Sequence, residues 1–248
     1  MRLPARASAA ALSAATALAL ATACGMLPDD APDATAPYTR LTAPEVVNKA
    51  LAATRAAKSV RMTVEAASPE GPVEAFVATD IRGECTVTLS MGAAGTMELV
   101  RTGGTVRTRS DAAMLRSAST APAENLAGHW VSPTAADRHA ELAERYCDRE
   151  TFLGSLAPKT GTARKGPTAA PGSGTPALTV TGGSRDGKWT ADIATEGRPF
   201  LLKLRLPRGG TKGGTEGGTE GGTEGGTAPV TVEFSEFDKP FTASRPKT

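Results

Sequence analysis

The spacing of apolar residues changes from a helical to an extended period near residue 59. Residues 42–45 read Thr-Ala-Pro-Glu, a capping box in which the threonine hydroxyl and the glutamate carboxylate each accept a hydrogen bond from an exposed backbone N–H. Apolar residues then recur with a helical period as far as residue 58, and strict alternation follows over 60–66. The pattern predicts an amphipathic helix followed directly by a half-buried strand.

The alternation of apolar and polar residues returns in a series of short segments. It predicts further strands at 73–81, 85–91, 97–99, 105–108, 177–181, 188–194, 200–206 and 230–234. Several of these segments are joined by glycine-containing turns. Because short strands joined by tight turns pair with their neighbours along the chain, the sheet is expected to be antiparallel.

The middle of the chain is predicted to be helical. A short helix is expected over 111–117, and Ser132-Pro133 is a favourable N-cap and first-position pair for a helix that runs to about Cys147. Asp148 is then placed to cap a further helix that ends at Leu156. Helices beside an antiparallel sheet define the α+β fold class.

Two segments are too rich in glycine, proline and small residues to predict regular structure. Residues 158–176 combine Pro, Gly, Thr and Ala, and residues 208–229 contain three consecutive Gly-Gly-Thr-Glu repeats. Both are expected to be flexible, because ordering such chain costs conformational entropy that small side chains do not recover. The repeat lacks the spacing of phosphate-binding glycine loops, so no chemistry is assigned to it.

The first 24 residues have the composition of an export signal. Arg2 and Arg6 precede an apolar run over 7–20, and small residues lead to Cys24. The segment resembles a bacterial lipoprotein signal, which implies cleavage before Cys24 and attachment of lipid to it. The apolar run is too short to span a hydrocarbon core of ~30 Å. The leucine before the cysteine stands four residues away rather than three, so an ordinary secretory signal with a free Cys24 thiol is the alternative.

Cleavage at this point divides the chain into three parts. They are a signal peptide (1–23), a tether (24–41) and a single domain (42–248) that includes the two expected flexible segments. The tether is rich in proline and aspartate, which disfavours packing. Acyl chains on Cys24 are expected to hold the domain on the extracytoplasmic face of the cell membrane.

Charge and cysteine content fit this location. The formal net charge of +2 falls to zero when the signal is removed, because the signal contains two arginines and no acidic residue. A neutral chain without basic runs lacks the clustered Lys and Arg that nucleic-acid binding needs, so no nucleic-acid partner is expected. Cys85 and Cys147 remain as an even pair in an oxidising compartment and are expected to form a disulfide. Two buried free thiols are the alternative.

The sequence contains no recognisable catalytic or metal-binding pattern. Its two histidines, His129 and His139, do not occur in an H-E-x-x-H motif, and G-x-S-x-G and C-x-x-C motifs are absent. Triad and zinc sites need more partners at defined spacing than these residues provide. We therefore assign no catalytic residue, no metal ligand and no cofactor, and we expect a protein that is not an enzyme.

Four short segments carry a resemblance to a known family. They are Ala57–Arg61, Gly128–Val131, Gly197–Leu201 and Phe234–Phe237. Together with the order of the predicted elements, they resemble the LppX/LprG family of actinobacterial lipoproteins. The resemblance implies a strongly curved antiparallel half-barrel, related to the LolA and LolB carriers, with helices packed on its concave face. It also implies a carrier of lipids or other apolar envelope molecules, without catalysis.

An apolar ligand of this kind would occupy a cavity between the sheet and the helices. The candidate cavity residues alternate along three predicted strands and are Val60, Met62, Val64, Val87, Leu89, Met91, Phe200, Leu202 and Leu204. In the alternative interpretation the same residues fill the core, and the folded surface binds another envelope protein in assembly or sensing. The sequence leaves both interpretations open.

Overall fold

The chain divides into two compact units, residues 1–33 and 34–248. The computed structural model describes residues 38–68, 71–118, 126–134, 137–169, 174–184, 187–207 and 229–243, all in the second unit. The expected signal peptide, Cys24 and residues 208–228 of the expected glycine-rich segment lie outside the described residues.

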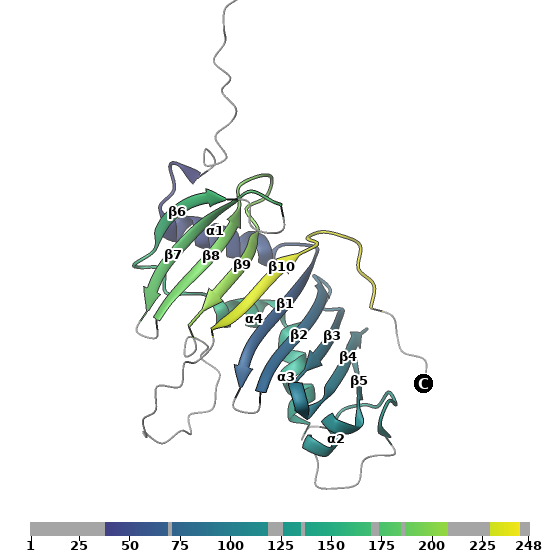
Figure 1. Ribbon diagram of the computed structural model, residues 1–248. Helices are drawn as coiled ribbons and strands as arrows, with labels where there is room; N and C mark the ends of the chain where they lie inside the picture. Colours follow the sequence, from purple (N-terminus) through teal and green to yellow (C-terminus); the bar gives the residue numbers. More distant parts are fainter. Residues whose placement is uncertain are drawn as a thin grey trace, which may run out of the picture. The chain divides into compact units, whose positions relative to one another are not determined.

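Ten antiparallel strands form one curved sheet that is not closed into a barrel (Figure 1). In chain order they are β1 (Ser59–Ser68), β2 (Gly71–Asp80), β3 (Cys85–Ser90), β4 (Thr96–Thr102), β5 (Thr105–Ser110), β6 (Arg164–Ala169), β7 (Ala177–Ser184), β8 (Gly187–Ala194), β9 (Leu201–Leu206) and β10 (Val230–Ser235). Their order across the sheet is β5-β4-β3-β2-β1-β10-β9-β8-β7-β6. This sheet and its helices confirm the predicted α+β fold class.

The two halves of the sheet meet where the last strand pairs with the first. Strands β1 to β5 form one meander and β6 to β10 form another, and β10 pairs with β1 at the centre. In this pairing Met62 lies opposite Phe234 and Val64 lies opposite Val232. Because side chains alternate between the faces of a strand, these apolar residues share one face of the sheet.

The helices cover that face, which we call the inner face (Figure 1). Helix α1 (Ala43–Arg55) contacts β8 and β9, and α3 (Arg138–Cys147) contacts β2, β3 and β4. Helix α4 (Arg149–Leu156) contacts both α1 and α3, and α2 (Ala112–Ala118) contacts β4 and β5. A three-residue 3-10 turn, η2 (Gly92–Ala94), separates β3 from β4.

Helix α1 begins where the sequence predicts and ends three residues early. Thr42 N donates to Glu45 Oε2 over 2.7 Å and Glu45 N donates to Thr42 Oγ1 over 3.4 Å, so the capping box is confirmed. The helix ends at Arg55 rather than at about Lys58. Lys58 N instead donates to Asp238 Oδ1 over 2.6 Å, which aligns the chain for entry into β1.

Helix α3 begins later than the sequence predicts. Its N-cap is Asp137, whose carboxylate accepts from His139 N over 3.1 Å and from Ala140 N over 2.9 Å. The expected start at Ser132-Pro133 is wrong. Val131 exchanges two backbone hydrogen bonds with Thr108, which holds the chain in an extended conformation at this residue. The other predicted cap is confirmed, because Asp148 Oδ1 accepts from Thr151 N over 3.0 Å at the start of α4.

Part of the expected flexible connector 158–176 is an edge strand. Residues 164–169 form β6, which pairs with β7 through the partners Arg164 and Thr181 and has a bulge before Thr168. The residue composition did not indicate this strand. Its pairing relies on main-chain hydrogen bonds, and its side chains are largely exposed. Lys165 Nζ donates a hydrogen bond to the Leu41 carbonyl over 2.8 Å, which connects β6 to the segment before α1.

A disulfide joins the sheet to the helical layer. Cys85 opens β3, Cys147 closes α3, and the two are bonded with their Cα atoms 5.6 Å apart. Arg101 on β4 adds a second connection, because its Nη2 donates to the Cys147 carbonyl over 2.8 Å. The junction between α3 and α4 is therefore fixed to one end of the sheet.

Candidate functional site

Most of the expected cavity residues lie together on the inner face of the sheet. Seven of the nine belong to one buried cluster, with exposed fractions of 8% or less, and they are Val60, Met62, Val64, Val87, Leu89, Met91 and Leu204. They come from β1, from β3 and the residue after it, and from β9. The alternation in the sequence therefore identifies the correct face on the first two of these segments.

The remaining two expected cavity residues, Phe200 and Leu202, do not belong to this cluster. Leu201 is buried in place of Leu202, because the register of β8 against β9 shifts between Asp192 and Ile193. Ile193 pairs with Leu201 and Asp192 pairs with Lys203, so Leu202 is passed over. The correction applies to the start of β9, where Leu201 is buried instead of Phe200 and Leu202. The buried residues of β9 are Leu201, Leu204 and Leu206.

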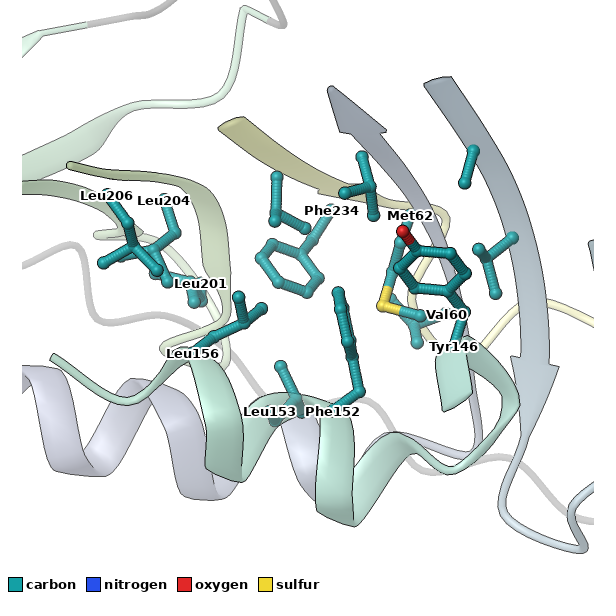
Figure 2. Close-up of a cluster of buried hydrophobic side chains, with 14 of the residues drawn as sticks. Val60, Met62, Tyr146, Phe152, Leu153, Leu156, Leu201, Leu204, Leu206 and Phe234 are labelled. Atoms are coloured by element: carbon teal, nitrogen blue, oxygen red, sulfur yellow. The ribbon is translucent and has the colours of Figure 1, made fainter. Parts of the chain in front are cut away.

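The helices supply the other wall of the candidate site. Tyr146 from α3 and Phe152, Leu153 and Leu156 from α4 are buried against the sheet, where Figure 2 places them facing Val60, Met62, Leu201, Leu204 and Phe234. The rings of Tyr146 and Phe152 meet edge to face, with centroids 5.3 Å apart. These side chains were not predicted from the sequence, although the spacing of residues 149, 152, 153 and 156 marks one side of a helix.

Polar groups are few within this layer. Burial raises the pKa of Tyr146 from its ordinary value. The Thr54 hydroxyl on α1 accepts from Leu201 N over 3.0 Å, so this buried polar group has a partner. Among the described residues, no three His, Cys, Asp or Glu side chains lie close enough together to hold a metal ion. The layer offers apolar surface and very few directional contacts.

Charged residues gather where α4 begins, at the end of the sheet formed by the start of β1 and the end of β2. The Asp80 carboxylate accepts from Arg82 N, Arg82 Nε and Glu84 N, each over 2.9 Å. Asp238 accepts from Arg198 Nη1 over 2.9 Å, in addition to its bond with the chain before β1. Arg149, the first residue of α4, is buried beside these carboxylates.

A hollow of about 230 Å³ opens at the β4–β5 edge of the sheet. It is lined by Thr96, Glu98, Arg109, Ser110, Asp111 and Gly128. Its charged groups already have partners: Arg109 Nη2 lies 2.6 Å from Glu98 Oε2, and Asp111 accepts from Thr96 N over 2.8 Å. The Arg109 guanidinium also lies over the Trp130 ring, 4.9 Å from its centroid. These contacts support local structure at the edge.

No helix among the described residues has the length and apolar character needed to cross a membrane. No known family profile matches the sequence, and no curated protein matches it. Solved structures to which the chain is similar include LprF and MucB. LprF from Mycobacterium bovis, of the LppX/LprG family, shares 15% identity with a TM-score of 0.47, over 83% of this chain and 97% of LprF. MucB, with a LolA-like fold, shares 15% identity with a TM-score of 0.36, over 83% of this chain and 60% of MucB.

Proposed function

We propose that this chain is a non-enzymatic protein of the cell envelope that binds a lipid or another apolar molecule between the inner face of its sheet and helices α3 and α4. In this proposal acyl chains on Cys24 hold it on the extracytoplasmic face of the cell membrane. The observation that carries the proposal is the buried apolar layer, whose two walls come from separate elements of the fold.

The way the two walls are joined makes exchange with an apolar ligand feasible. The α4 wall meets the sheet through apolar side chains, and such contacts are not directional. An apolar chain can therefore replace them while the backbone ladder of the sheet stays intact. The Cys85–Cys147 bond keeps the helical layer attached at one end when the layer moves away from the sheet.

The free energies of burial favour a ligand with a long apolar chain. Burying a saturated chain of about 16 carbons gains roughly 12 kcal/mol, at ~0.8 kcal/mol for each CH₂ group. Displacing the side chains of Phe152, Leu153 and Leu156 costs roughly 1.5–3 kcal/mol each. A long acyl chain offsets that cost, whereas a short one does not.

Native mass spectrometry of protein purified from its own host, followed by organic extraction, tests the proposal. We expect a copurifying apolar molecule, and we expect Val64→Trp to remove it, because Val64 is buried on the inner face. Thr63→Trp is the matched control, because Thr63 lies on the opposite face of the same strand and is only partly buried. Protein that is always empty would contradict ligand binding.

The membrane anchor has its own test. Cys24→Ala in the native host is expected to move the protein from the membrane fraction to the soluble fraction. Thr22→Ala keeps a small residue before the cysteine and serves as the control. If the Cys24→Ala variant stays in the membrane fraction, Cys24 is not the residue that anchors the protein.

One observation favours a second candidate, a lipid-anchored protein that binds an envelope protein and has a filled core. The inner-face residues are packed against helix side chains, with Leu89 and Leu153 fully buried. Partner binding at the outer surface should survive Val64→Trp. Crosslinking in the native host, compared between wild type and this variant, distinguishes the two candidates.

A further inference from the structure

Arg149 occupies an unusual position for a charged residue. It is the first residue of α4 and shares the buried side of that helix with Phe152, Leu153 and Leu156. Its exposed fraction is only 9%, and its Nη1 atom is buried without a hydrogen-bond partner. The guanidinium therefore lies at one end of the apolar layer that the proposed ligand would occupy.

The neighbouring carboxylates do not satisfy this nitrogen. Asp80 and Asp238 contribute negative charge beside Arg149, but neither makes a hydrogen bond to Nη1. Asp80 pairs with Arg82 over 2.9 Å, and Asp238 pairs with Arg198 over 2.9 Å. Because each carboxylate is already paired with another arginine, both stabilise the charge of Arg149 electrostatically but leave its Nη1 without a hydrogen bond.

An unpartnered charged donor is costly inside a protein. Its desolvation is not repaid unless an acceptor reaches it, and buried polar groups in native structures nearly always have one. Burial lowers the pKa of Arg149 from its ordinary value, while Asp80, Asp238 and Glu150 act in the opposite direction. A guanidinium stays protonated at neutral pH, so Nη1 remains a charged donor.

We propose that Arg149 binds the anionic head of an amphiphile, a carboxylate or a phosphate, whose apolar chain lies against the side of α4 that carries Phe152 and Leu153. This inference rests on the proposed function and names the class of ligand. Nη1 donates a hydrogen bond to a head-group oxygen, and the chain extends from Arg149 into the apolar layer. The structure thereby gives the site a polar end and an apolar end.

An anionic head fits this donor better than a neutral one. Hydrogen bonds between two charged groups are shorter and about twice as strong as neutral ones, and guanidinium matches carboxylate and phosphate geometry. An ester oxygen accepts a hydrogen bond but does not neutralise the buried charge. We therefore expect a preference of about tenfold or more for the acid over its ester.

The test uses the full mature chain, released from detergent micelles into native mass spectrometry with three probes of equal chain length: palmitate, hexadecyl phosphate and methyl palmitate. The first two separate a carboxylate from a phosphate head. Arg149→Met removes the charge and keeps an apolar side chain of similar length, and Arg149→Lys keeps a charge. Arg145→Met is the matched control, because Arg145 lies on the exposed side of α3 with 58% of its side chain accessible.

We expect wild type and Arg145→Met to prefer at least one anionic probe about tenfold over methyl palmitate. Arg149→Met should lose this preference and bind the ester as wild type does, and Arg149→Lys should retain part of it. A preference that persists in Arg149→Met, or a wild type that binds ester and acids equally, overturns the role of Arg149 and leaves apolar ligand binding standing. Wild type that binds none of the three probes overturns the proposed function itself.

The melting temperature of the ligand-free protein provides an independent readout. If Nη1 awaits a ligand, Arg149→Met removes a buried charged donor that has no hydrogen-bond partner and should leave the melting temperature unchanged or raise it. If Arg149 instead serves only to attach α4 to Asp80 and Asp238, the same substitution should lower it. A lower melting temperature together with an unchanged probe preference would overturn the inference.

Discussion

The rings of Phe200 and Phe237 stack with their centroids 4.0 Å apart and their planes 3° from parallel. Arg198 and Asp238 form a salt bridge of 2.9 Å beside this stack, and the Arg198 guanidinium lies over the Phe200 ring. Two of the four segments on which the family resemblance rests therefore meet at one end of the central strands β9 and β10. Their shared role is structural, because they join the start of β9 to the end of β10.

Phe237→Ala should destabilise the protein by about 1–3 kcal/mol, because it removes a stacked, partly buried ring. Urea unfolding measures the change. Phe76→Ala is the control: this ring is 49% exposed, and its removal should change the free energy of unfolding by less than about 0.5 kcal/mol. Equal effects of the two substitutions would show that the stack contributes nothing specific.

The structure shows which features the sequence could predict. Local signals succeeded where one segment decides its own structure: the capping box before α1, the Asp148 cap and the alternation of β1 and β3. The predictions failed where the structure of a segment depends on its pairing with a distant segment. The phase of β9 depends on its register against β8, and composition alone gave no sign of the main-chain pairing of β6 with β7.

The choice between two good N-caps illustrates the same limit. Ser132 and Asp137 both suit the start of a helix by residue type. The backbone pairing of Val131 with Thr108 selects the later one, and a partner more than 20 residues away is not visible in a local pattern. For the candidate site, the apolar strand residues were predictable, whereas the position of Arg149 beside Asp80 and Asp238 required the fold.

The Cys85–Cys147 disulfide should contribute about 4 kcal/mol to stability in the chain-entropy account, because it closes a loop with a sequence separation of 62 residues. We expect the double variant Cys85→Ala/Cys147→Ala to have a free energy of unfolding lower by about 4 kcal/mol, and therefore a lower urea midpoint. Adding a reductant should lower the stability of wild type and leave the double variant unchanged. Wild type that is insensitive to reductant while its thiols become titratable would contradict this contribution.

Asp148 should make the stability of α4 depend on pH in the acid range. The hydrogen bond from Thr151 N is the largest cause that lowers the pKa of Asp148 below its ordinary value. A carboxyl with a lowered pKa stabilises the folded state fully above its unfolded pKa, near 4, and this contribution is lost as the pH falls through the folded pKa. Wild type should therefore lose stability below about pH 4 relative to Asp148→Asn.

Asp148→Asn is the informative variant, because asparagine keeps a capping oxygen but does not titrate. Asp148→Ala removes the cap at every pH and should cost about 1 kcal/mol at neutral pH. Urea unfolding from pH 7 to pH 2.5 measures both effects. Parallel curves for wild type and Asp148→Asn across this range would exclude the Asp148 carboxylate as a source of acid sensitivity.

Gly182 on β7 leaves space for the ring of Trp189, its partner on β8. A Cβ atom at Gly182 would lie 2.3 Å from the Trp189 ring, which is almost completely buried, and Trp189 Nε1 donates to the Lys159 carbonyl over 3.2 Å. Gly182→Ala should therefore displace the indole and cost about 1–3 kcal/mol. The matched control is Gly183→Ala, where the nearest atom would be a Thr162 oxygen at 3.8 Å. Tryptophan fluorescence and urea unfolding report the change, and two variants with equal stability would show that the ring moves aside freely.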